Sequence, residues 1–168
     1  MEKLILQMHN LQQALLTLRE SFEDIKGSDA PCSKSQIVLM QDGIIQRFEY
    51  CYDGFWKCLK FFLEQMHNIE DVKSPRSVFR TCVECKIFSE EQGDTFMIMV
   101  DDRNETTHTY DFQQTRQIID RIKDYYKLMQ TITDNAGIAL GEAPKAKKPR
   151  ATKTAMARRR ALRAKRAK

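Results

Sequence analysis

The stretch from residue 35 to residue 66 constrains the fold most, because its apolar residues recur at helical steps along its whole length. This spacing predicts one long amphipathic helix. Trp56, Leu59 and Leu63 widen the apolar stripe, which indicates a central helix with neighbours on several sides. The stripe itself consists of Ile37, Met40, Ile44, Phe48, Cys51, Phe55, Cys58, Phe62 and Met66.

A similar stripe predicts a helix over residues 2–26, which Gly27 and the turn-prone SDAP should end. Ser74 before Pro75 suits the N-cap and first position of a short third helix. Ser89 has capping-box spacing to Gln92 and predicts the start of a fourth helix. The first helix should bury Leu4, Leu11, Leu15, Leu18, Phe22 and Ile25, and the fourth Phe96, Met99 and Val100.

Asp111 and Gln114 repeat the capping signal for a fifth helix. Its apolar positions are Phe112, Ile118, Ile119, Ile122, Tyr126, Leu128 and Met129. No segment of useful length alternates with period two, so strands are not expected. We expect an all-α fold, an up-and-down bundle of about five helices in one domain over residues 1–136.

Residues 137–168 form a basic tail rich in Ala, Lys and Arg. From Glu142 onward it has 12 Lys and Arg against one acidic residue, whereas the preceding part has 16 basic and 22 acidic residues. The tail has too little apolar surface to fold alone, so we expect it to be disordered and to bind nucleic acid through phosphate contacts. A solubilising tail without a partner is the alternative. The predicted phosphate contacts are Lys147, Lys148, Arg150, Arg158, Arg159, Arg160, Arg163, Lys165 and Arg166.

The composition indicates a cytoplasmic protein with no membrane span and no cofactor. The apolar runs are too short to cross a bilayer, and the first ten residues lack the cleavage site of a secretory signal. Five cysteines without regular spacing argue for a reducing compartment. Cys82 and Cys85 have zinc-ligand spacing, but a zinc site needs a second pair of ligands.

The sequence RNETTHTYD, residues 103–111, gathers polar side chains between the fourth and fifth predicted helices. His108 could move a proton to or from a ribose hydroxyl, and Arg103 could bind two phosphate oxygens, which suits RNA cleavage. On a continuous helix the two side chains would diverge by about 140°. They meet only if the helix ends between them or if a second copy supplies the missing group. The alternative is an ordinary polar turn.

RNETTHTY resembles the Arg-x4-His-x-Tyr motif of the HEPN superfamily. The stretch IQRFEYCYDGFWKCLKFFLE resembles the central helix of its nucleotidyltransferase substrate-binding subfamily, the HepT-type toxins paired with MNT antitoxins. SPRSVFR resembles the short helix of that family, so the likeness covers roughly residues 4–130. The basic tail is not a usual feature of the family.

The resemblance implies a homodimer that acts as a metal-independent ribonuclease, with one histidine from each chain. It makes Arg103 and His108 the catalytic pair, Asn104 a supporting residue and Tyr110 the tyrosine that an MNT nucleotidyltransferase can adenylylate. RNA and an MNT-type antitoxin would be the partners. Two alternatives stay open: a non-catalytic subunit of a nucleotidyltransferase, and a nucleic-acid-binding protein that acts through its tail.

Overall fold

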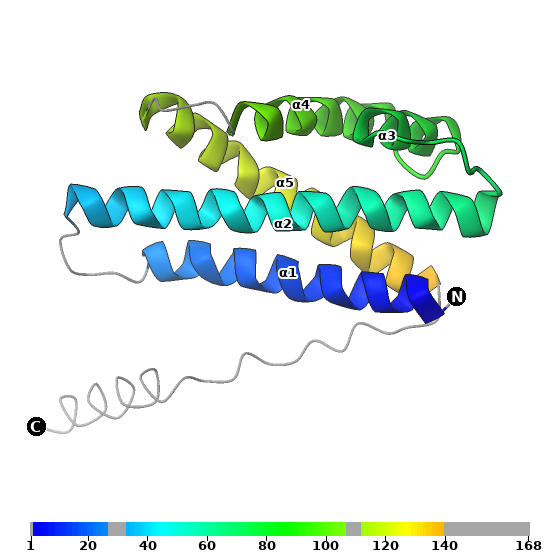
Figure 1. Cartoon of the computed structure of the whole chain (residues 1–168), viewed down its shortest axis with the longest axis horizontal. Coiled ribbons are helices and arrows are strands. Elements are labelled where there is room, and N and C mark those ends of the chain that lie inside the picture. The colour runs from blue at the N-terminus through cyan, green and yellow to red at the C-terminus, as the bar shows by residue number, and fades with distance from the viewer. Residues whose placement is uncertain (1, 27–32, 107–111, 140–168) are drawn as a thin grey trace, which may run out of the picture.

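The computed structural model of the chain describes residues 2–26, 33–106 and 112–139, and these residues form five helices and no strands (Figure 1). The all-α prediction is therefore confirmed. Of the tail predicted over residues 137–168, residues 137–139 belong to the last helix, and the rest, including its nine predicted phosphate contacts, lies outside the described residues. The helices are α1 (Glu2–Lys26), α2 (Lys34–His67), α3 (Pro75–Glu84), α4 (Glu90–Thr106) and α5 (Phe112–Ala139).

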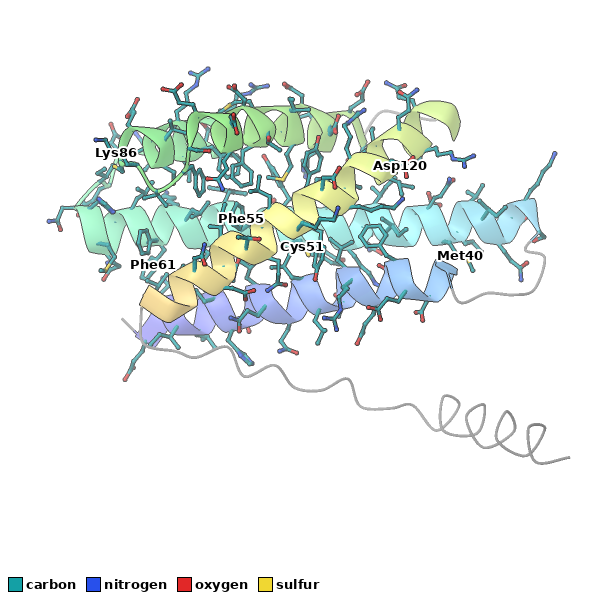
Figure 2. The ribbon with its side chains drawn as sticks, turned by 180° about the vertical axis from the view of Figure 1, so that it is seen from behind. Met40, Cys51, Phe55, Phe61, Lys86 and Asp120 are labelled. Carbon is teal, nitrogen blue, oxygen red and sulfur yellow. The ribbon has the colours of Figure 1, made fainter. Side chains whose placement is uncertain are left out.

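Helix α2 occupies the centre of the bundle, as its wide apolar stripe predicts. It packs along α1 in an antiparallel pair and contacts α3 and α5 as well. Helices α3 and α4 lie on the side of α2 that faces away from α1 (Figure 1). Helix α5 crosses the bundle diagonally and contacts α1, α2 and α4 (Figure 2). No described helix is long and apolar enough to cross a membrane.

The helix starts agree with the capping signals in the sequence. Ser74 caps α3 at the backbone N–H of Ser77, and Pro75 takes the first helical position. The Ser89 hydroxyl oxygen accepts from the Gln92 N–H at 3.2 Å, and the Gln92 side chain accepts from the Ser89 N–H at 2.9 Å. These reciprocal bonds are a capping box and open α4. The predicted cap Asp111 lies outside the described residues.

Four rings fill the core between α2, α3 and α4. Phe96 lies 4.8 to 5.2 Å, centroid to centroid, from Phe55, Phe79 and Phe88. We call these four residues the phenylalanine cluster. Gly93 allows α3 and α4 to approach closely here, since a Cβ on it would lie 2.5 Å from the Val83 side chain. Dispersion contacts and apolar burial therefore hold α3 and α4 to α2 at this end.

The apolar stripe of α2 predicts burial wrongly at the two ends of the helix. Ile37 is 38% exposed and Met66 is 48% exposed, although their spacing predicts burial. Helix α2 is longer than α1 and extends past it at both ends (Figure 1). An amphipathic pattern predicts which face of a helix is apolar, but burial needs a neighbour at the same height.

Candidate functional site at the end of α4

Two of the four predicted site residues are described, and both lie in the last turns of α4. Arg103 is half-buried, and its Nε is buried without a hydrogen-bond partner in the described part of the chain. Asn104 is exposed. His108 and Tyr110 lie between Thr106 and Phe112, outside the described residues. The described half of the site is therefore a cation at the C-terminal end of a helix, where the helix dipole favours it.

Tyr52 of α2 is close enough to this end of α4 for the charge of Arg103 to act on its hydroxyl. Its side chain is buried, and burial raises its pKa to about 12 while the positive charge of Arg103 opposes the rise. The charges of Arg76 and Asp101 also act on the Tyr52 hydroxyl. Sequence spacing predicts no role for Tyr52, because it falls beside the apolar stripe of α2. Tyr52 is nevertheless a buried side chain near Arg103.

Asp102 anchors the end of α4 to α5 through a buried polar network. Its carboxylate accepts hydrogen bonds from Arg121 Nε at 2.6 Å, Arg121 Nη2 at 2.7 Å and the Tyr125 hydroxyl at 2.6 Å. Burial, followed by the bond to Asp102, raises the pKa of Tyr125, and the same carboxylate raises the pKa of Arg121. Asp102, Arg121 and Tyr125 are the Asp102 network below. No motif or spacing in the sequence predicts a role for these three residues.

The chain is also fixed on both sides of residues 107–111. The Thr106 hydroxyl lies 2.9 Å from Glu49 Oε1 of α2 and 2.7 Å from the Arg103 carbonyl oxygen. The Gln114 amide of α5 donates to the Glu105 carboxylate of α4. Together with the Asp102 network, these bonds hold the end of α4 and the start of α5 in one arrangement.

A cavity beside the end of α4 and the start of α5 is lined by acidic and neutral residues. It has a volume of about 570 Å³ and lies between the first half of α2, Thr106 and Thr115. Asp42 and Glu49 contribute carboxylates to it, and no Lys or Arg is among its described lining residues. The lining of this cavity therefore does not favour an anion.

The cysteines behave as core residues in this structure. Cys51, Cys58 and Cys82 are buried, and burial raises their pKa values to about 12, 11 and 12. Cys51 and Cys58 belong to the apolar stripe predicted for α2, and their burial agrees with it. Among the residues that the structure describes, no three His, Cys, Asp or Glu side chains gather in a way that could hold a metal ion.

A family model described as nucleotidyltransferase substrate binding protein like matches residues 6–136. The chain belongs to this family. The match covers all five helices apart from the ends of α1 and α5. It contains Arg103, Asn104, His108 and Tyr110, whereas the basic tail lies beyond it. The recognition made from the sequence motifs is confirmed.

Solved structures of similar proteins have this fold. A crystal structure from Thermus thermophilus is 33% identical, with a TM-score of 0.63, and covers 74% of this chain and 97% of the relative. A Haemophilus influenzae protein, described as a substrate-binding domain of a nucleotidyltransferase, is 22% identical over 76% and 97% of the two chains, with a TM-score of 0.66. No curated protein matches the sequence.

The HEPN superfamily enters through a third solved structure, a tri-AMPylated HEPN toxin from Shewanella oneidensis in complex with its MNT antitoxin. It is 16% identical, covers 80% of this chain and 96% of the toxin, and has a TM-score of 0.64. At this identity the likeness shows the fold alone. The helical bundle of this chain is therefore similar in fold to that toxin.

Proposed function

We propose that this family member is a metal-independent endoribonuclease that works as a homodimer. Arg103 and His108 of each chain form its catalytic pair. The observation that carries the proposal is the buried Nε of Arg103, which has no hydrogen-bond partner in the described part of the chain. A buried donor without a partner costs free energy, and a phosphate oxygen at the end of α4 would satisfy it.

The reaction needs one base, one acid and one cation. A neutral His108 takes the proton from a ribose 2′-hydroxyl, whose oxygen attacks the adjacent phosphorus. The bond from phosphorus to the 5′-oxygen breaks, and the protonated His108 of the second chain returns a proton to that oxygen. Arg103 stabilises the charge that develops on the phosphoryl oxygens, and Asn104 supplies a further hydrogen bond to them. A 2′,3′-cyclic phosphate and a 5′-hydroxyl are the products.

The bonds around the segment support this assignment of roles. The Asp102 network and the Thr106–Glu49 bond restrain the backbone on which Arg103 stands. Catalytic groups work best when their position is set before the substrate arrives. The cation at the end of α4 is therefore preorganised by residues that themselves need not touch RNA.

The test is cleavage of a single-stranded RNA by the purified full-length chain in the presence of a metal chelator. Arg103→Ala and His108→Ala should each lower kcat/KM by about a hundredfold or more, the usual scale for general acid–base and charge-stabilising groups. Arg80→Ala and His9→Ala, which change exposed residues of α3 and α1, are the matched controls. Equal cleavage by all four variants would show that the site is elsewhere.

The family description favours a second function, a non-catalytic subunit that binds a separate nucleotidyltransferase. In that case the full-length chain should co-purify with an MNT-type enzyme and should not cleave RNA.

Under the leading proposal the same enzyme is an antitoxin and adds AMP to Tyr110. Negative charge and bulk beside Arg103 would then block phosphate binding. Mass spectrometry of the parent and of Tyr110→Phe after incubation with ATP and the enzyme locates the modification.

The basic tail would add affinity for RNA or another nucleic acid rather than catalysis. Removal of residues 142–168 should weaken binding and flatten its salt dependence, since fewer counterions are released. Metal-independent cleavage should persist in the shortened chain at low salt. Loss of all nucleic-acid binding together with an uncleaved RNA would instead favour the tail as the functional element.

A further inference from the structure

Arg76 occupies a position that its own helix disfavours. It is the second residue of α3, and the positive end of the helix dipole lies at that end. The start of α3 is already capped by Ser74, Ser77 and Pro75, so the helix does not need Arg76 to begin there. A cation against a helix dipole raises the local positive potential, which is useful where an anion binds.

The described partner of Arg76 does not account for this placement. Arg76 forms an ion pair with Asp101 of α4, and the two side chains are 43% and 63% exposed. Exposed pairs of this kind contribute little to stability, because water and salt screen them. The guanidinium can therefore leave the carboxylate for a phosphate at small cost.

Arg76 also belongs to the same cluster of charges as Arg103. Tyr52 is buried, and the charges of Arg103, Arg76 and Asp101 all act on its hydroxyl. The other acidic group near Tyr52 is Asp53, which pairs with Lys57 at 3.1 Å. Arg76 of α3 therefore lies near the end of α4: it pairs with Asp101, two residues before Arg103, and both arginines act on the same buried tyrosine.

We propose that Arg76 is a second phosphate anchor for the RNA strand, next to the phosphate that Arg103 holds. The assignment rests on the ribonuclease function proposed above. Asp101 holds Arg76 in place while the site is empty and gives it up when the strand enters. Arg76 is then a positioning residue, which binds a phosphate that does not react. The site would recognise at least two successive phosphates of a single strand.

The first experiment compares cleavage by full-length Arg76→Ala with the parent and with Arg80→Ala. Arg80 is an exposed arginine one turn further along α3. Arg76→Ala should raise KM about tenfold and leave kcat nearly unchanged, because the lost hydrogen bond to a charged group acts equally on bound substrate and transition state. The slope of log(kcat/KM) against log[salt] should become shallower by about 0.7, the value for one phosphate contact on a single strand. Arg80→Ala should match the parent.

The second experiment replaces Asp101, and we expect KM to change in the opposite direction. Asp101→Asn frees Arg76, so KM should fall severalfold, and the gain should disappear in the double variant Arg76→Ala/Asp101→Asn. If the ion pair only fastened α3 to α4, both single variants would lower the thermal midpoint and neither would change KM. That result, or equal KM values for Arg76→Ala and Arg80→Ala, overturns the anchor.

The two proposals fail in different ways. A parent chain that cleaves no RNA removes the ribonuclease proposal and the anchor with it. A parent that cleaves RNA, and that loses cleavage in Arg103→Ala but not affinity in Arg76→Ala, removes the anchor alone. Circular dichroism of each variant shows whether the bundle has folded before either conclusion is drawn.

Discussion

The two ends of α4 use the same helix in opposite ways. Near its start, Phe96 joins the phenylalanine cluster and is fully buried among other rings. Near its end, the Asp102 network places a carboxylate, a guanidinium and a hydroxyl where apolar side chains could pack. Lys86 and Phe61 mark the first end in Figure 2, and Asp120 and Met40 mark the second. The first end is held by the packing of apolar rings, and the second by hydrogen bonds between charged and polar side chains.

The difference separates stability from placement. Burying a phenylalanine ring is favourable wherever it has neighbours, and the exact direction of the ring matters little. Burying the charge of Asp102 costs desolvation, which the bonds from Arg121 and Tyr125 offset rather than exceed. What such a network adds is a defined direction for the last turns of α4. Because Arg103 is the next residue, the network also fixes the position of its backbone.

The largest effect should come from the apolar end. Phe96→Ala removes the ring that contacts three others in the phenylalanine cluster and should lower the free energy of unfolding by about 3–5 kcal/mol. Denaturant titration measures the change. Ile98→Ala, on the exposed side of the same helix, should cost less than about 0.5 kcal/mol. Similar losses in both variants would mean that the cluster is not the core of this end.

A smaller loss of stability, but a larger loss of function, is expected at the polar end. Asp102→Asn keeps the side-chain size and removes the charge that pairs with Arg121, which should cost about 1–3 kcal/mol. Cleavage of RNA should fall further than the folded fraction does, because Arg103 loses its restraint. Asp124→Asn, whose ion pair with Lys127 is exposed, is the control. A proportionate fall in stability and cleavage would assign Asp102 to folding alone.

The same contrast explains what could be predicted from the sequence. The apolar end follows from local rules: helical spacing predicts the burial of Phe96 and Met99, and both are fully buried. Ser89 and Gln92 predict the start of α4 for a reason that lies within four residues. Each of these signals is local, so it survives without knowledge of how the helices are arranged.

The polar end depends on where helices cross. Asp102 is 19 residues from Arg121 and 23 from Tyr125, and no periodicity relates them. Spacing selects Tyr126 as the apolar tyrosine of α5, yet Tyr125 is the more deeply buried of the two, because α5 turns it toward α4. The family motif identifies Arg103 from the sequence. The residues that hold it emerge only from the crossing of α4 and α5.

Alkaline pH should lower the stability of the folded chain through Tyr52, the buried tyrosine near Arg103. Burial raises the pKa of Tyr52 from 10.0 to about 12, so the folded chain keeps a proton there that the unfolded chain releases first. The stabilising contribution is complete below pH 10 and is lost as the pH rises toward 12. At pH 11 the unfolding free energy of the parent should have lost on the order of 1 kcal/mol through this group.

Tyr52→Phe isolates that loss, because phenylalanine keeps the ring and has no proton to release. The difference in unfolding free energy between parent and variant should move by on the order of 1 kcal/mol in favour of the variant between pH 9 and pH 11. Tyr50→Phe changes a tyrosine of the same helix that is 62% exposed, and its difference from the parent should stay constant. A constant difference for both variants would mean that Tyr52 reaches water at the end of α4. Water would then reach the interior near Arg103, at the C-terminal end of α4. The two ends of the helix would differ in solvent access as well, because the phenylalanine cluster near the start is buried.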